Sequence, residues 1–265
     1  MRVDGASIHL RKAEGALGLN INLFLQRLGS QGKPAQTPPS KRKPWVIAQD
    51  ALQAVSVGVD DQQAREVQDA FALHPIRIEQ IALELANLQV KGNTLVVDVQ
   101  HCAGRYADHP LVLKQLCTGL QLTPEGMHLA KLVLQTKGSH IKGDIQLRYN
   151  NLSALAQFVD KVDIVAQLDE VVLAAEELGI FFPYFKQHPT VYTLKSRLVG
   201  HVSDFCLEDF QFRFGQEPSH LNGSIHLRGL PHCQAMLFDL KLNSGCLHAA
   251  DLLPYVHRSE ERRVG

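Results

Sequence analysis

The residues of this chain that could take part in chemistry are numerous but scattered. Thirteen histidines and five cysteines are present. No two cysteines have the C-x-x-C spacing of a zinc ribbon, and their odd number disfavours a disulfide framework. His101–Cys102 and His232–Cys233 are adjacent pairs, whose side chains would point to opposite faces of a strand. We therefore expect no metal site and no cofactor, and cysteines that pack as small buried hydrophobic residues.

Two pairs of neighbouring carboxylates offer another route to catalysis. Glu176–Glu177 falls on an expected short helix and Asp60–Asp61 in an expected turn, so solvated surface positions explain both pairs. The sequence contains no phosphate-binding loop, dinucleotide-binding motif, nucleophile elbow or HExxH motif. The sequence therefore predicts a protein that is not an enzyme.

The composition favours a globular chain without nucleic-acid partners. Of the 265 residues, 45% are hydrophobic and 20% are charged, which is typical of folded domains. Lys and Arg total 27, as do Asp and Glu, whereas a nucleic-acid binder usually carries a basic excess. The sequence has no run of 18 apolar residues, so it predicts no membrane-spanning helix, and residues 1–5 do not resemble a signal peptide.

The order of segments predicts a mainly β chain. Residues 1–28 contain a strand, Ser7–Arg11, and a short helix; residues 29–44 form a flexible loop rich in Pro and Lys; order resumes at Trp45. From Pro75 onward, apolar and polar residues alternate between turn signals 8–12 residues apart, the pattern of antiparallel strands with one apolar face. The alternating segments are Ile76–Leu85, Leu95–Val99, Leu111–Leu122, Met127–Thr136, Ile141–Leu147, Val191–Val202, Phe205–Phe214, Leu221–Leu227 and Met236–Leu242. Short helices are expected at Asn151–Val159, Ala174–Ile180 and Ala249–Val256.

An internal repeat lies within this β-rich part. Met127–Arg148 recurs at Phe205–Arg228, and every strand residue keeps its face in the alignment. Leu173–Leu178 resembles Leu247–Leu252 further along, which gives related units of about 127–180 and 205–257. A weaker copy starts at Ile76. Because a unit of a few strands cannot bury its apolar face alone, residues 45–257 are predicted to form one repetitive sheet, either closed as a barrel or open as a groove.

The ordered motifs resemble the TamB family, a group of AsmA-like proteins of diderm bacteria that includes the translocation and assembly module. The likeness covers roughly residues 1–257 and is carried by four motifs in order. They are Leu17–Asn20 with a loop ending at Lys43–Trp45, Phe71–Ile78, Leu122–Met127 with the strands ending at Gly143–Ile145, and Leu221–Pro231 running into Phe238–Leu242.

This resemblance implies a periplasmic protein, anchored in the inner membrane, whose repeated strands form a curved, taco-like β-groove. The family is linked to phospholipid movement toward the outer membrane and to outer-membrane protein assembly. The chain then is an internal fragment, without the family's anchor and C-terminal domain. Residues 258–265 resemble a translated sequencing adapter, so we expect this tail to be non-native.

The alternation identifies which side chains would line such a groove. A continuous apolar trough would shield acyl chains, because exposing 16 carbons to water costs roughly 10 kcal/mol or more. The same residues could instead pack as core beneath the helices, since alternation fixes a face and not what covers it. The candidate lining residues are Leu83, Leu85, Val97, Val99, Leu132, Leu134, Ile145, Leu147, Phe210, Phe212, Ile225 and Leu227.

Three functions compete at this point. The first is a segment that conducts phospholipids between the inner and outer membrane, with acyl chains as its partners. The second is a scaffold for outer-membrane protein assembly or secretion, which would offer exposed strand edges to an outer-membrane β-barrel assembly protein. The third, a carbohydrate-active β-solenoid enzyme, needs clustered carboxylates on one repeated face, where this chain has apolar residues.

Overall fold

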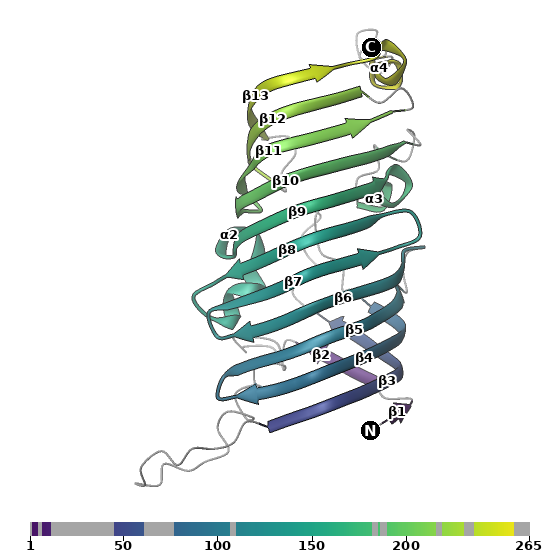
Figure 1. The fold of residues 1–265 in the computed structure, drawn as a ribbon, viewed down its shortest axis with the longest axis vertical. Helices are drawn as coiled ribbons and strands as arrows, with labels where there is room; N and C mark the ends of the chain where they lie inside the picture. Colours follow the sequence, from purple (N-terminus) through teal and green to yellow (C-terminus); the bar gives the residue numbers. More distant parts are fainter. Residues whose placement is uncertain are drawn as a thin grey trace.

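The computed structural model describes residues 2–4, 7–11, 45–60, 77–106, 110–181, 185, 190–215, 219–230 and 236–256. These residues form one sheet of thirteen strands that extends along the whole molecule (Figure 1). The expected helix within residues 1–28, the loop at 29–44 and the tail at 258–265 lie outside the described residues.

The strands are long and the helices short. The strands are β1 (Arg2–Asp4), β2 (Ser7–Arg11), β3 (Trp45–Asp60), β4 (Arg77–Lys91), β5 (Thr94–Tyr106), β6 (Val112–Thr123), β7 (Gly126–Gln135), β8 (His140–Arg148), β9 (Asp163–Ala174), β10 (Val191–His201), β11 (Asp204–Phe214), β12 (Ser219–Arg228) and β13 (Leu237–Cys246). The helices are the 3-10 helix η2 (Leu152–Gln157), α2 (Phe158–Lys161), α3 (Ala175–Phe181) and α4 (Ala249–Val256). No helix in the described ranges is long and apolar enough to cross a membrane.

The sheet is a meander. From β3 to β13 each strand pairs antiparallel with the next strand in the chain, while β1 and β2 pair with β3 in parallel. Among the described strands β13 pairs only with β12, so the sheet stays open. Strands joined by short connections fold onto their sequence neighbours, which is what the regular turn spacing predicted.

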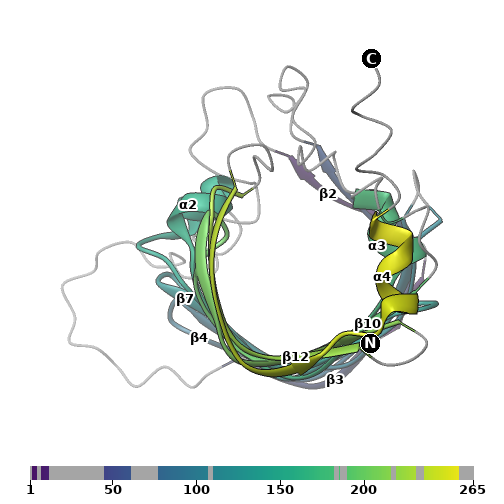
Figure 2. The ribbon, with the colours of Figure 1, turned by 90° about the horizontal axis from the view of Figure 1, so that it is seen from above.

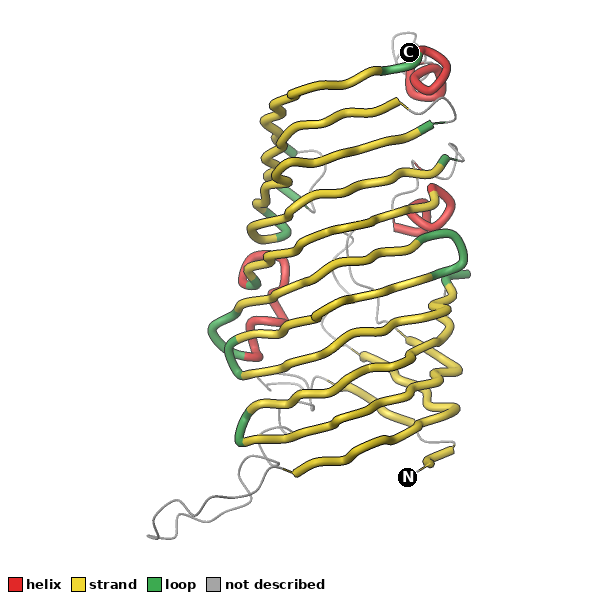
Figure 3. Tube along the Cα trace, viewed as in Figure 1, coloured by secondary structure: helices red, strands yellow, loops and turns green. Residues whose placement is uncertain are grey.

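The sheet is bent across its strands into a trough with a U-shaped cross-section (Figure 2). The short helices lie at the two rims of the trough, α2 on one side and α3 and α4 on the other, and strands make up nearly all of its wall (Figure 3). The predicted fold class, a curved and taco-like β-groove with a few short helices, is confirmed.

Most predicted elements are present, with three differences. The strands β1 and β9 were not predicted. In β9 the apolar positions Ile164, Ala166 and Leu168 alternate, and Val171 follows after three residues instead of two. The register shift between Lys142 and Gly143 on β8 lies opposite this extra residue, so β9 carries a bulge, as β7 and β11 do. Asp60, expected in a turn, is instead the last residue of β3.

The sequence repeat corresponds to a unit of four strands followed by a helix. The strands β6 to β9 with α3 form one unit, and β10 to β13 with α4 form the next. Unit two continues the sheet of unit one directly, because β10 pairs antiparallel with β9. Stacked units thus share one continuous surface, as expected for a repeat that cannot bury its apolar side alone.

Candidate functional site: the apolar face and its rims

Register pairs connect apolar side chains into rows that cross the sheet, and we call the surface they form the apolar face. One row has an apolar residue on each of the nine strands from β5 to β13. Its members are Val97, Leu120, Leu129, Ile145, Ala166, Leu198, Leu207, Ile225 and Leu240. At the usual strand spacing of about 4.8 Å this row is about 40 Å long.

A second row runs beside the first, toward the rim where α2 lies. It consists of Leu95, Leu122, Met127, Leu147, Ile164, Gly200, Phe205, Leu227 and Phe238. Gly200 is its one position without an apolar side chain. Two parallel rows of this length make a strip and not an isolated patch.

All twelve predicted lining residues belong to the apolar face. Val97, Ile145, Leu147, Ile225 and Leu227 are members of the two rows. The other seven join the face through their register partners, and they are Leu83, Leu85, Val99, Leu132, Leu134, Phe210 and Phe212. The prediction missed other members, such as those of β6, β9 and β10, although their alternation carries the same signal.

The burial of these residues places the apolar face on the inside of the bend. Val97, Leu132 and Phe210 are 4%, 5% and 5% exposed, and the other nine predicted residues are half-buried. Apart from β2 and the end of β3 at the N-terminal end, Figure 2 shows no described strand across the trough, so along the rest of the sheet neighbouring rows must provide this burial. A bent sheet crowds the side chains on its concave side and separates those on its convex side, so the apolar face is concave.

Bulges keep the apolar face in phase along each strand. Lys131 and Asp209 have positive φ angles of 51° and 48° and lie within the register shifts of β7 and β11. A carbonyl in each bulge accepts a hydrogen bond from a hydroxyl of the neighbouring strand. Thr118 Oγ1 donates to the Ala130 carbonyl at 3.0 Å, and Ser196 Oγ donates to the Glu208 carbonyl at 3.0 Å. The extra residue restores the face, so that Leu129 and Leu132 lie on the same side.

Two repeated glycines allow neighbouring backbones to approach closely on this face. A Cβ on Gly143 would clash with the carbonyl oxygen of Gln167, and a Cβ on Gly223 would clash with that of Lys241. The weaker upstream copy starts at Ile76, 51 residues before Met127, and at the same offset it would match Gly92 to Gly143. Gly92 lies instead in the turn between β4 and β5 with open space around it. That upstream correspondence therefore does not extend to Gly92.

The wall changes from aliphatic to aromatic between the two units. Leu132 and Leu134 on β7 are replaced by Phe210 and Phe212 on β11. Phe212 stacks on Tyr192 at a centroid distance of 6.1 Å and on Phe214 at 5.6 Å. Ring stacking adds about 0.5–1.5 kcal/mol to the burial of apolar area, so these ring contacts stabilise the wall of unit two.

The rim that holds α3 and α4 is fastened by a repeated carboxylate latch. In unit one, Glu177 accepts hydrogen bonds from the hydroxyls of Thr136 and Ser139, at 2.6 and 2.5 Å, and from the Gly138 N–H at 2.9 Å. In unit two, Asp251 accepts hydrogen bonds from the Ser219 hydroxyl at 2.8 Å and from the Ser219 N–H at 3.1 Å.

The serine completes each latch in the same way. Ser139 Oγ accepts from the Ala174 N–H at 3.0 Å, and Ser219 Oγ accepts from the His248 N–H at 2.9 Å. Burial raises the pKa of the Glu177 carboxyl, but the hydrogen bonds that it accepts outweigh this effect, so its pKa is lowered overall. The interpretation of Glu177 as a solvated surface residue was wrong, whereas Glu176 is exposed as expected.

The opposite rim, which holds η2 and α2, contains a small apolar cluster. Tyr149, Ala154 and Val162 are buried there, and Leu122, Met127 and Leu147 of the apolar face pack against them. Burial raises the pKa of Tyr149 to about 12, and its hydroxyl donates to the Thr123 carbonyl at 3.2 Å. The second row of the apolar face therefore continues without a break into this rim.

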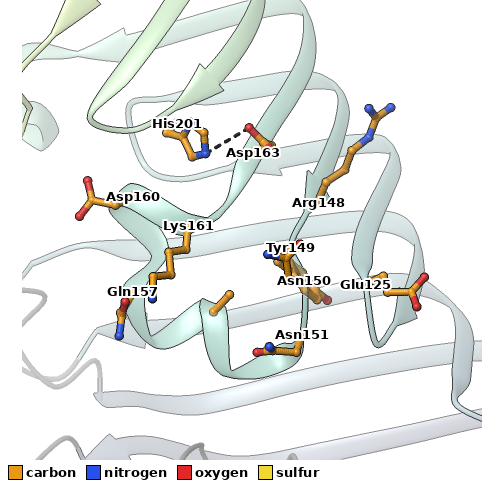
Figure 4. Close-up of a pocket in the computed structure, with 11 residues that line it drawn as sticks. Glu125, Arg148, Tyr149, Asn150, Asn151, Gln157, Asp160, Lys161, Asp163 and His201 are labelled. Atoms are coloured by element: carbon orange, nitrogen blue, oxygen red, sulfur yellow. Dashed lines mark ion pairs between the residues drawn. The ribbon is translucent and has the colours of Figure 1, made fainter.

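A polar cleft of about 580 Å³ lies above that cluster, which we call the rim pocket (Figure 4). Tyr149 and Ala154 line it from the cluster, while charged side chains surround the rest. His201 Nε2 lies 3.2 Å from Asp163 Oδ1 at one side of it, where β10 and β9 are neighbours (Figure 4). The sequence carries no signal for this pocket, because its residues come from five elements, which are β8, η2, α2, β9 and β10, and from two loops.

The convex side of the sheet carries cross-strand ion pairs. Lys142 Nζ lies 2.6 Å from Glu170 Oε2, and His128 Nε2 lies 2.6 Å from Asp144 Oδ1. The hydrogen bond from Lys142 lowers the pKa of Glu170. Such exposed pairs contribute little to stability and are typical of a solvated outer surface.

No group of three or more His, Cys, Asp or Glu side chains in the described residues could hold a metal ion. His101 and Cys102 lie on β5, and the pair His232–Cys233 lies outside the described residues. Burial, and secondarily the nearby Cys117, raises the pKa of the Cys102 thiol, which disfavours the reactive thiolate.

Comparisons of the chain with models of protein families, with curated proteins and with solved structures find no match.

Proposed function

We propose that this chain is a segment of a periplasmic protein of the TamB type, in which the apolar face shields phospholipid acyl chains as they move between the inner and outer membrane. The observation that carries the proposal is the row of nine apolar residues from Val97 to Leu240, one on each successive strand. A membrane anchor in other parts of the parent protein would hold this segment in place.

The energetics favour an acyl chain as the occupant. Each methylene removed from water contributes about 0.8 kcal/mol, so a chain of 16 carbons gains roughly 10 kcal/mol from a continuous apolar surface. The row is about 40 Å long at the usual strand spacing, which exceeds the roughly 30 Å hydrocarbon core of a whole bilayer. A row without charged members leaves no point at which the acyl chain must return to water.

Site-specific photo-crosslinking tests this proposal with matched controls. A photoreactive side chain at Leu134 or Phe212 lies on the apolar face, whereas one at Val133 or Arg213 lies on the convex side of the same strand. We expect phospholipid adducts, detected by mass spectrometry, at the first two positions and not at the second two. No lipid adduct on the apolar face, or equal capture on both sides, would contradict the proposal.

The outer edge of β13 favours a second candidate function, a scaffold for outer-membrane protein assembly that binds client strands. In unit one the equivalent strand β9 is covered by β10, and its Ala166 is 2% exposed. In unit two the equivalent Leu240 is 40% exposed, and Phe238 and Leu242 are 64% and 51% exposed. An amphipathic strand with the β10 pattern would satisfy this edge by β-augmentation.

A peptide with the sequence Val191–His201 tests the edge directly, because its register on β9 is known. We expect it to bind the chain and a scrambled peptide not to bind. The Lys241 carbonyl faces Gly223 on β12, so the backbone of the preceding residue, Leu240, faces the outer edge. Replacing Leu240 with proline removes an outward backbone donor from β13 and should weaken binding if the edge is the site. Binding that is unchanged in this variant would exclude the β13 edge.

A further inference from the structure

The rim pocket has charges of both signs around one cleft. Arg148 and Lys161 are basic, Glu125 and Asp160 are acidic, and Asp163 lies beside His201 at one side of the cleft (Figure 4). Among the described residues, none of the first four forms an ion pair within 4.0 Å. These four side chains therefore keep their charges available to a ligand.

The pocket borders the buried cluster of this rim. Tyr149 and Ala154 line the pocket and belong to the cluster against which Met127 and Leu147 of the apolar face pack, whereas no residue of the two rows lines the pocket itself. The cluster therefore links the pocket to the second row by packing. The volume of about 580 Å³ lies in the usual range for small-molecule sites.

We propose that the rim pocket binds the headgroup of a zwitterionic phospholipid, a phosphate joined to an ammonium group. The phosphate would pair with Lys161 or Arg148, and the ammonium group would pair with Glu125 or Asp160. A headgroup with a phosphate but no ammonium would leave these carboxylates facing an anion, so the pocket selects against it. This inference rests on the proposed function for the acyl chains, but it assigns a separate site.

Soluble headgroups test the pocket without the acyl chains. Glycerophosphoethanolamine carries both charges, whereas glycerophosphoglycerol carries the phosphate alone. In NMR titrations of the whole chain, we expect the first compound to shift the amide signals of Asn150 and Asn151, which line the pocket, with about two- to five-fold higher affinity than the second. Absent shifts, or equal affinities for the two compounds, would overturn the headgroup assignment.

A charge reversal provides the variant arm. Glu125→Lys with Asp160→Lys makes the pocket basic, and the preference should invert toward glycerophosphoglycerol. The control pair Glu84→Lys with Asp239→Lys makes the same change of net charge on β4 and β13, outside the pocket lining, and should keep the original preference. If the preference inverted in both double variants, the net charge of the chain alone would set the headgroup preference, which would also overturn the assignment.

The two proposals fail in different ways. Lipid adducts at Leu134 without any headgroup preference would remove the headgroup site and leave the proposed function intact. Selective headgroup binding without lipid adducts would leave the pocket and remove the acyl-chain function, and it would indicate a soluble phosphoethanolamine compound as the ligand.

Discussion

The glycines Gly143 and Gly223 show how single residues shape the apolar face. They occupy equivalent positions in the two units, and at each a Cβ would collide with a carbonyl oxygen of the next strand. The sequence repeat identified both residues as equivalent. It could not show the reason, because the colliding atoms belong to Gln167 and Lys241, which lie 18 or more residues away.

Replacing Gly143 with alanine should therefore lower the free energy of unfolding by about 1–3 kcal/mol, since the strand must shift to admit the methyl group. Gly119→Ala is the matched control, because a Cβ there lies 3.7 Å from its nearest neighbours, which is ordinary contact. Urea unfolding followed by circular dichroism measures both. Equal stability of the two variants would contradict the close approach of β8 and β9.

The bulge residue Lys131 gives a second prediction at this scale. Its side chain is exposed, so a substitution acts mainly through its backbone φ of 51°. Lys131→Val should destabilise the fold by about 1–2 kcal/mol, because a β-branched residue fits the left-handed region poorly. Lys131→Asn should be neutral or stabilising, since asparagine tolerates this conformation. Thermal unfolding of the two variants should shift in opposite directions or by clearly different amounts.

The elements of this fold were predictable to different degrees. Alternation identified β6, β7, β8 and β10 to β13 closely, even though a bulge interrupts it in β7 and β11, because each strand has one apolar and one polar side. The strand β9 was missed although Ile164, Ala166 and Leu168 alternate before its bulge. The latch of Glu177 was not predictable either, because its partner Ser139 lies 38 residues away and the pairing depends on how α3 sits on the rim.

The latch makes a prediction about pH. Because the folded pKa of Glu177 is lower than its unfolded value, the unfolded chain takes up a proton first as the pH falls. The latch therefore stabilises the fold above the ordinary pKa of about 4.3, and this stabilisation is lost as the pH falls through the folded value. Glu177→Gln should be less stable than wild type near neutral pH, with a difference that shrinks below about pH 4.

Urea unfolding at several pH values measures this difference. Glu176→Gln is the control, because Glu176 lies beside Glu177 in the first turn of α3 but is exposed. It should show no comparable loss near neutral pH. A Glu177→Gln variant whose deficit stays constant down to about pH 3 would show that the carboxylate charge is not what fastens the rim.

At the scale of the whole molecule, the alternation of residues left undecided whether the sheet closes on itself. Alternation fixed which side chains share a face, but a barrel and an open groove require the same pattern. The open form follows from the order of pairing, in which β13 has only β12 beside it among the described strands. The rim pocket could not be predicted from the sequence either, since it forms only when η2 and α2 lie beside the end of β10.

This open stack should show a gradient of local stability. The strands β9 and β13 occupy equivalent places, but β9 has a partner on both sides, whereas β13 has a described partner on one side only. In a stack whose units contact only their neighbours, the end strand opens most readily. Amides of Leu237–Cys246 should therefore exchange at least about tenfold faster than those of Asp163–Ala174 in hydrogen-exchange mass spectrometry.

Adding the Val191–His201 peptide should slow exchange in β13 and leave β9 unchanged, since β13 pairs only with β12 in the described part of the sheet whereas β9 is paired on both sides. Equal protection of the two strands before the peptide is added would show that something else already covers the β13 edge. Slower exchange throughout the sheet would show instead that the peptide acts on the stack as a whole. Slower exchange in β13 alone is the result expected for a groove that extends by pairing a further strand at its edge. Each added strand then buries the apolar residues of the strand before it.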